Sequence, residues 1–191
     1  PGLLGNGLQV AVCDNANSFG QTVTAATLTL TATPGSTTIG LSDTGGQAVL
    51  TTALNAITIG DLITIGGQQL KVTAKGTASA GATSTSTLTV QTAYFGIGVA
   101  TQVGSFARQW EYASLFGSAP GTSAGAALAG GVGDELHLVV IDKNGVFSGV
   151  RGQVLEAYEG LSRASDVRGE QGGSLFFKDV INNGSAYIYV N

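Results

Sequence analysis

The stretch LITIGGQQLKVTA, residues 62–74, decides the first half of the fold. A short apolar run from Leu62 to Ile65 is followed by Gly66 and Gly67, and a second run begins at Gln68. Paired glycines supply the positive φ angles that a tight two-residue turn demands. The stretch therefore predicts a β-hairpin.

Threonine-rich alternation extends this β pattern in both directions from the hairpin. Apolar residues and hydroxyls alternate in residues 23–25, 28–32 and 87–92, which is the period of a half-buried strand. Threonine favours a sheet over a helix because its branched Cβ loses rotamer freedom in a helix. We expect residues 21–93 to form an inserted all-β module, a small barrel or sandwich, with residues 75–86 as a flexible loop.

Charge divides the chain into two regions. Residues 1–107 hold five of the 20 charged residues, and residues 108–191 hold the other fifteen. We therefore predict two structural units, the module at 21–93 and a second domain made from residues 1–20 and 94–191.

Strand signals dominate the second domain. Residues 136–141 form a continuous apolar run broken only by His137, as expected of a strand covered on both faces. Asn144-Gly145 then predicts a hairpin whose return strand is residues 146–150. Residues 154–161 alternate as a strand does, although a helix stays open as an alternative for so short a stretch.

One helix is predicted near the carboxyl end. Ser174 is a suitable N-cap, and apolar residues at helical spacing continue to about Asn182. Gly184 ends this helix, and residues 185–190 are expected to form a strand, whereas residues 117–133 are expected to be loop. The predicted fold class is α+β and predominantly β, with a mixed sheet and a minor helix in the second domain.

Composition excludes several classes of partner. The net charge of −4 and the scattered basic residues give no footprint for a phosphate backbone, so we expect no nucleic-acid partner. The longest apolar runs, such as 138–141, are far shorter than the roughly 20 residues of a membrane span, so no membrane insertion is expected. The single cysteine, Cys13, lies in an apolar run and is interpreted as a small buried hydrophobe. Because the chain starts at Pro1, we expect it to be a fragment of something longer.

Catalytic residues are scarce. The only imidazole, His137, lies inside the most apolar run, where a structural role is favoured over general base catalysis. Asp134 and Glu135 are consecutive and so point to opposite faces of a strand, which predicts a solvated strand entrance instead of an acid and base pair. One histidine and one cysteine give no metal-ligand spacing. We predict no enzyme, no catalytic, metal or cofactor-binding residues, and no cofactor.

Three further patterns are given structural interpretations. The glycine-rich residues 130–133 lack the Lys-Ser/Thr ending of a phosphate-binding loop. Residues 183–185 match a glycosylation triplet but are interpreted as a helix-ending turn. One aromatic and charged cluster is expected to pack between the two units, and its members are Arg108, Trp110, Glu111, Tyr112 and Phe116.

Several segments, in this order, resemble the tail sheath proteins of contractile-tailed bacteriophages, specifically the large multidomain type. The resemblance covers about 110 residues of the chain, nearly all outside the Thr-rich module. The segments are residues 1–2, 5–10, 112–116, 119–123, 134–142 with Gly145, 154–162 and 177–182. Residues 21–93 are not dictated by the family pattern and resemble small β modules of phage tail proteins, and the terminal arms and carboxyl-terminal core of sheath proteins are missing.

The resemblance implies a structural subunit of the virion tail, assembled in the host cytoplasm. It implies six-fold rings of identical subunits stacked around a tail tube protein, with baseplate and tail terminator proteins as further partners. Arms that add strands to a neighbour's sheet would keep the subunits connected during contraction, which drives the tube through the host envelope. We expect residues 21–93 to be peripheral and dispensable for contraction.

The alternative function is a carbohydrate-binding or adhesin-like β module on a virion surface. It requires an exposed aromatic platform, whereas the chain has no aromatic residue between Phe19 and Tyr94. That absence makes the sheath the preferred prediction.

Overall fold

The computed structural model describes residues 3–191, and it divides into two compact units. One unit consists of the segments up to Phe19 and from Tyr112 onward, and the other of residues Gly20–Glu111. The fold class is α+β and predominantly β, as predicted. Pro1 and Gly2, which belong to the phage sheath resemblance, lie outside the described residues.

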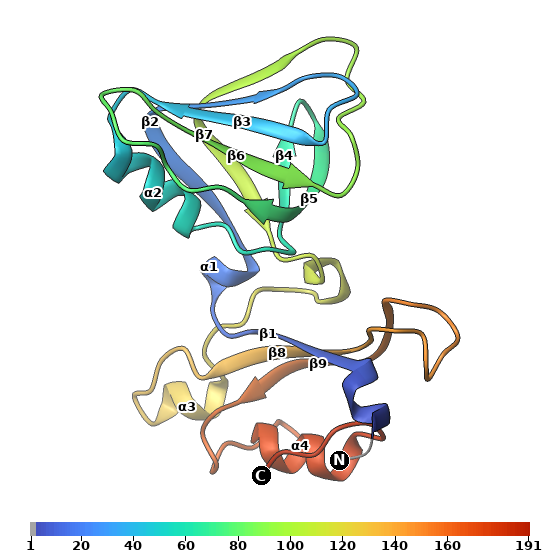
Figure 1. Cartoon of the computed structure of the whole chain (residues 1–191). Helices are drawn as coiled ribbons and strands as arrows, with labels where there is room; N and C mark the ends of the chain where they lie inside the picture. The colour runs from blue at the N-terminus through green and yellow to red at the C-terminus, as the bar shows by residue number, and fades with distance from the viewer. Residues whose placement is uncertain (1–2) are drawn as a thin grey trace. The chain divides into compact units, whose positions relative to one another are not determined.

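The unit Gly20–Glu111 is a closed β-barrel in which the strand order is β2-β3-β6-β5-β4-β7 (Figure 1). Every pairing between neighbouring strands is antiparallel. The strands are β2 (Gly20–Ala32), β3 (Thr38–Asp43), β4 (Leu62–Ile65), β5 (Gln68–Lys75), β6 (Ser84–Val90) and β7 (Ala100–Gln109). Of the two predicted forms of this module, the structure has the barrel.

The predicted hairpin joins β4 to β5. Gly66 and Gly67 have φ angles of 56° and 78°, the two positive values that a type I′ turn requires. The register places Ile65 opposite Gln68, so the turn contains only the two glycines. The local signal in residues 62–74 therefore gave the correct turn and register.

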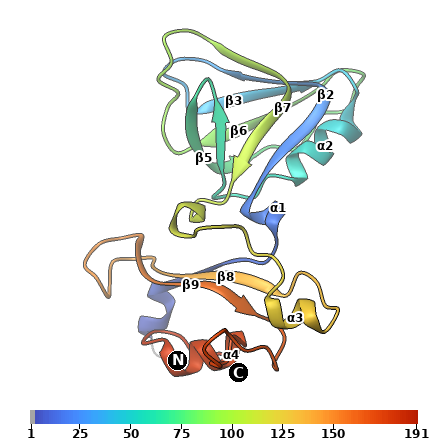
Figure 2. The same cartoon turned by 180° about the vertical axis from the view of Figure 1, so that it is seen from behind.

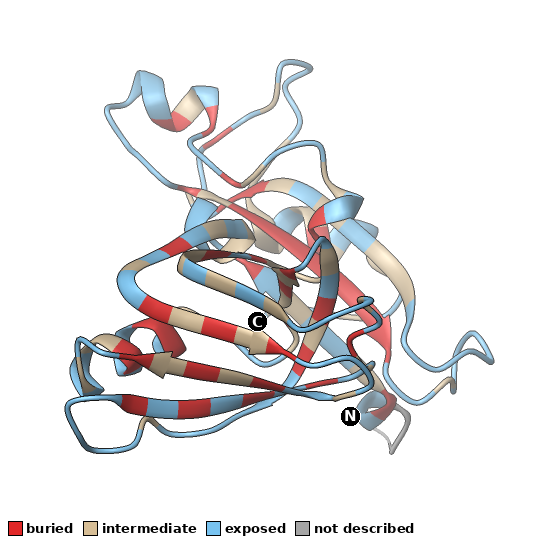
Figure 3. Ribbon diagram, turned by 90° about the horizontal axis from the view of Figure 1, so that it is seen from above, coloured by how far each residue is buried: buried red, intermediate tan, exposed pale blue. Residues whose placement is uncertain are grey.

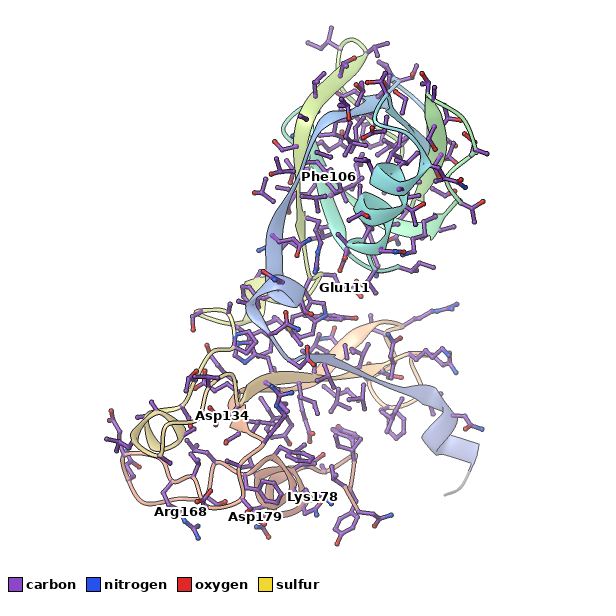
Figure 4. The ribbon with its side chains drawn as sticks, turned by 90° about the vertical axis from the view of Figure 1, so that its left-hand side faces the viewer. Phe106, Glu111, Asp134, Arg168, Lys178 and Asp179 are labelled. Carbon is purple, nitrogen blue, oxygen red and sulfur yellow. The ribbon has the colours of Figure 1, made fainter. Side chains whose placement is uncertain are left out.

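Alternation along the strands fills the barrel interior. Figure 3 shows buried and exposed residues following one another along the strands. In β6 the pattern is strict, because Ser84, Ser86, Leu88 and Val90 are buried while the threonines between them are exposed. Phe106 of β7 is among the largest fully buried side chains and is labelled in Figure 4.

Helix α2 (Gln47–Asn55) lies beside β2 and was not predicted (Figure 2). Its buried residues Leu50, Ala53 and Leu54 belong to the same apolar cluster as the barrel strands. Lys75 donates hydrogen bonds to the carbonyls of Leu54 and Ile57, at 2.9 and 2.7 Å, and so satisfies acceptors at the end of the helix.

The predicted boundary of the module at residue 93 lies inside the barrel unit. β7 begins at Ala100 and pairs with both β2 and β4, so it closes the barrel. Sequence placed this strand in the other domain because residues 94–109 lack the dense threonine alternation of residues 21–93.

The second unit is built on a three-stranded antiparallel sheet in the order β1-β8-β9. The strands are β1 (Leu8–Cys13), β8 (Glu135–Asp142) and β9 (Gln153–Ser162). Among residues 3–191, the parallel pairing expected of a mixed sheet is limited in this unit to an isolated bridge between Ser162 and Phe176. β8 is buried along nearly its whole length, as its apolar run predicted.

The remaining elements of this unit are short. They are η1 (Leu3–Gly7), α1 (Ala16–Phe19), η2 (Ala113–Leu115), α3 (Ala124–Leu128) and α4 (Phe177–Gly184). Figure 1 shows α4 lying along one face of the sheet, where Ile181 packs with Leu136, Leu138 and Val140. In the part of the chain that the structure describes, no helix is long and apolar enough to cross a membrane.

Three predictions for this unit are corrected. Residues 146–150 form a turn followed by a bend, and the return strand of the hairpin begins at Gln153. The predicted helix begins at Phe177 and not after Ser174, whose hydroxyl instead accepts from the Phe176 amide at 3.2 Å. Residues 185–190 form no strand and pair with none in the part of the chain that the structure describes. The side chains of Glu156, Asn182 and Ser185 accept from several of their amides instead.

Candidate functional site

The free edge of β1 is the principal candidate site. Within the described residues, β1 pairs only with β8, so its other edge faces no strand. The Lys143 amide donates to the Gly7 carbonyl at 2.8 Å, which makes Gly7 and Lys143 a hydrogen-bonded pair. Because bonded and non-bonded pairs alternate in an antiparallel ladder, the backbone groups of Val10 and Val12 point away from β8.

The side chains at this edge are apolar and exposed. Val10 is 45% exposed and Val12 is 53% exposed. They lie opposite Val140 and Leu138, and those two residues contribute to the apolar cluster under α4. The apolar face that α4 covers on β8 therefore continues onto β1, where Val10 and Val12 are exposed. An unpaired edge with exposed valines is the feature that strand addition by another chain requires.

His137 is buried and hydrogen-bonded through both ring nitrogens, and its assignment to a structural role stays a prediction. The side chain is 1% exposed, and its Nε2 lies 2.8 Å from the Ser118 carbonyl. A carbonyl only accepts, so Nε2 carries the proton, and Nδ1 then accepts from the Gly160 amide at 3.1 Å. Phe116 stacks on the imidazole at a centroid distance of 4.5 Å, and Phe19 meets its edge at 5.9 Å.

The prediction of a solvated strand entrance at Asp134 is wrong. Asp134 is 9% exposed and accepts from the Ser123 amide, the Ser123 hydroxyl and the Ser162 hydroxyl at 2.8, 2.7 and 2.5 Å. Burial acts to raise the pKa of Asp134, but these hydrogen bonds from Ser162 and Ser123 outweigh it and hold the pKa below its usual value. Figure 4 labels this residue at the start of β8.

Glu135, the first residue of β8, also accepts from a backbone amide. It is half-buried, and its Oε2 accepts from the Gly121 amide at 2.8 Å. The two carboxylates therefore bind Gly121 and Ser123, two nearby residues of the same segment. That they do not act as an acid and base pair stays a prediction.

The predicted aromatic and charged cluster is divided between the two units. In the barrel unit, Arg108 forms a buried ion pair with Asp61 at 3.3 Å, and Glu111 pairs with Lys71. Burial raises the pKa of Asp61, although the Thr58 amide and Arg108 oppose this shift. Phe116 belongs to the other unit, where it contacts His137. Packing of this cluster between the units stays a prediction.

The glycine-rich residues and the glycosylation triplet both lie at helix ends. Gly130 and Gly131 end α3, because their amides donate to the Ala127 and Ala126 carbonyls as in a Schellman motif. Ser123 caps the same helix by accepting from the Ala126 amide. These two terminal signals were present in the sequence and mark a helix where only a loop was expected. Residues 183–185 end α4, as predicted, and Cys13 is buried.

Sequence reasoning missed the role of Asp142. Its carboxylate accepts from the amides of Val146, Phe147 and Ser148 and from the Ser148 hydroxyl, at 2.7 to 2.9 Å. Burial opposes ionisation, but these donors lower the pKa of Asp142 to about 2. Asp142 lies two residues before Asn144 of the predicted turn. That position was the signal that could have identified its carboxylate as an acceptor for the amides of the connection.

A shallow depression of about 460 Å³ lies on the barrel surface. It is lined by glutamine amides and threonine hydroxyls from β2, β4, β5 and β7, beside Arg108. Its lining contains no aromatic side chain, so it lacks the stacking platform that the carbohydrate-binding alternative requires. That alternative stays a prediction.

No group of three or more potential metal ligands occurs among the described residues. Comparisons with protein-family models, with curated proteins and with solved structures returned no match for this chain. Among the features of the described residues, the free edge of β1 is the one best suited to a partner.

Proposed function

We propose that this protein is a structural subunit of a contractile phage tail sheath, whose copies join through the free edge of β1. The exposed, unpaired edge carrying Val10 and Val12 is the observation that carries the proposal. The sequence resemblance covers β1, β8, β9 and α4, the elements that build and support this edge. The proposal includes no catalysis.

The edge suits a mesh of identical subunits. A strand from a neighbouring copy would gain main-chain hydrogen bonds from β1 and would cover the two exposed valines. Because such a contact joins different surfaces of two copies, it propagates into rings and stacks and does not close into a dimer. The extended sheath would be kinetically trapped and would contract to a state with better contacts between subunits.

Small gains per subunit would drive the contraction. The population of each state follows the free-energy difference between the states, so a difference of roughly a few kcal/mol per subunit becomes decisive when many subunits change together. No nucleotide would be consumed. The tube, baseplate and terminator proteins remain the partners that this proposal implies.

The edge is tested by Val12→Lys in the intact protein. A lysine on an exposed edge strand disfavours the addition of another strand, so we expect tubes or stacked rings in electron micrographs to be lost. The control is Val132→Lys, since Val132 is a valine exposed outside the sheet. Both variants should keep the circular dichroism spectrum of the unchanged protein.

Two results would contradict the proposal. One is normal assembly by Val12→Lys, and the other is an unchanged protein that stays monomeric under every assembly condition. Loss of assembly in both variants would show that added charge and not the β1 edge is responsible, and would also count against the proposal.

A further inference from the structure

The dipeptide Asn-Gly occurs three times in the chain, and asparagine is among the thermolabile residues of proteins. The three copies are Asn6-Gly7, Asn144-Gly145 and Asn183-Gly184. The backbone nitrogen of the glycine can attack the side-chain amide carbon of the preceding asparagine, because glycine has no Cβ to obstruct the approach. In a folded protein this attack requires that the peptide group between the two residues is free to rotate.

Two of the copies lie in helical turns. The first copy belongs to η1, and the third copy belongs to α4. Helical hydrogen bonds hold the peptide groups of such elements. In α4 these bonds continue past the third copy, since the Ser185 amide donates to the Ile181 carbonyl at 2.8 Å. Reaction there requires the helix end to open first.

The second copy lies in the connection between β8 and β9, residues 143–152, which Figure 1 shows extending beyond the ends of both strands. Asn144 is exposed. Within residues 3–191, neither the Asn144 side chain nor the Gly145 amide makes a hydrogen bond. The nitrogen that would attack and the side-chain amide that it would attack are therefore both unrestrained by hydrogen bonds.

The fold itself requires glycine at position 145. The φ angle of Gly145 is 77°, and a Cβ at this position would lie 3.0 Å from the backbone nitrogen of Arg151. Both features disfavour any side chain. A bulkier residue, which would obstruct the attack, is therefore excluded by the same geometry that forms the connection.

We propose that Asn144 is a site of spontaneous deamidation, which loosens the connection between β8 and β9 as the protein ages. The Gly145 nitrogen forms a bond to Cγ of Asn144, and the proton of this nitrogen leaves with the side-chain NH₂ group as ammonia. Water then opens the resulting succinimide ring. Cleavage of the bond from the Gly145 nitrogen to Cγ gives aspartate, and cleavage of its bond to the backbone carbon gives isoaspartate. The modification requires no assembly, so it goes beyond the proposed function.

Both products disturb the hydrogen bonds that organise the connection. Asp142, two residues before Asn144, accepts from the amides of Val146, Phe147 and Ser148. Aspartate at position 144 places a second negative charge near this carboxylate, and like charges repel. Isoaspartate lengthens the main chain between Asp142 and its donors by one carbon atom. We therefore expect the modified chain to hold these three amides less firmly.

Incubation of the whole chain in warm, mildly alkaline buffer, followed by peptide mass spectrometry, tests the assignment. A parallel sample unfolded in guanidinium chloride gives the intrinsic rate of each dipeptide. In the folded protein Asn144 should react within about threefold of its unfolded rate, whereas Asn183 should react at least roughly tenfold more slowly than when unfolded, because α4 must open first. Absence of reaction at Asn144, or equal slowing at Asn144 and Asn183, would overturn the proposal.

Amide hydrogen exchange in the aged protein tests the consequence for the connection. In modified chains the protection of the Val146, Phe147 and Ser148 amides should fall several-fold, because their hydrogen bonds to Asp142 are weakened. Protection of Val139 in β8 should stay the same. Unchanged protection at all three amides in fully modified chains would refute the loosening.

Substitution separates deamidation from other effects of ageing. Asn144→Gln keeps an amide, but its longer side chain would have to close a larger ring, so this variant should neither change in mass at position 144 nor lose protection in the connection. Asn183→Gln is the matched control and should age as the unchanged protein does. Equal loss of protection in aged Asn144→Gln would show that deamidation at this position is not the cause.

Discussion

At the scale of single residues, Asp142 organises the connection between β8 and β9. Its carboxylate is inaccessible to solvent and collects donors from three successive residues, Val146, Phe147 and Ser148. A carboxylate that accepts several amide protons is stabilised in its charged form. The connection is therefore held by one side chain that belongs to the end of β8.

Asp142 should make stability depend on pH in the acidic range. Its pKa is about 2 in the folded chain and about 3.9 in an unfolded chain, so its contribution is complete above about pH 4 and is lost as the pH falls toward about 2. Urea unfolding at a series of pH values should show this loss. In Asp142→Asn the urea concentration at the unfolding midpoint should be lower at neutral pH. The fall of that midpoint between neutral and acidic pH should also be smaller than in the unchanged protein.

The control for this measurement is Asp166→Asn, an exposed aspartate outside the connection. It should leave both the midpoint and its pH dependence nearly unchanged. An acid profile for Asp142→Asn that coincides with that of the unchanged protein would show that another group is responsible.

At the scale of elements, α4 covers one face of the three-stranded sheet through a narrow contact. Ile181 is its only buried residue among those described, and it packs with Leu136, Leu138 and Val140 of β8. Residues 185–190, which follow the helix, also contribute to this apolar cluster. Ile188 and Val190 pack against it, while Tyr187 and Tyr189 are exposed.

Truncation of this contact should be costly. Ile181→Ala removes a fully buried side chain and leaves a cavity, so we expect the free energy of unfolding to fall by about 2–5 kcal/mol. Asn183→Ala, at an exposed position of the same helix, should change it by less than about 0.5 kcal/mol. Urea denaturation monitored by circular dichroism compares the two variants, and similar effects would show that Ile181 does not anchor the helix.

At the scale of the whole molecule, the barrel is an insertion whose two connections leave from neighbouring positions. Gly20 at the start of β2 pairs with Gln109 at the end of β7. Paired residues of antiparallel strands lie about 5 Å apart, so the remaining chain can be rejoined across this point by a short linker.

Two deletions should therefore behave differently in the intact protein. Removing residues 20–111 and joining the ends with a short glycine linker should leave a folded sheet unit that still assembles in electron micrographs. Removing residues 21–93 should cause aggregation, because it leaves β7 without its partners β2 and β4. Equal behaviour of the two deletions would contradict the boundaries of the barrel unit, and failure of both to assemble would contradict a dispensable barrel.

The features predicted correctly from the sequence are those that depend on local interactions. The turn at Gly66 and Gly67 and the buried strand of residues 136–141 depend on local φ angles and local apolar pattern, and both were predicted correctly. The return strand was misplaced because the Asn144-Gly145 signal did not include the hydrogen bonds that Asp142 makes with the following residues.

Long-range pairing accounts for most of what was missed. β7 completes the barrel only through its pairing with β2 and β4, which its own composition does not reveal. The hydrogen bond from the Gly117 amide to Glu159 likewise joins residues that are 42 positions apart in the sequence. The valines of β1 were part of a recognised apolar run, but their exposure depends on which strands cover the sheet.

Closure of the barrel has a consequence for crowding. A cylinder whose ladder returns to its own first strand gives adjacent copies no main-chain template, so barrels held at high local concentration can touch only through side chains. The exposed side chains include many threonine and serine hydroxyls, a few charges and some apolar groups such as Phe95 and Ile97. The closed ladder therefore offers no strand edge along which neighbouring barrels could fuse into a continuous fibre.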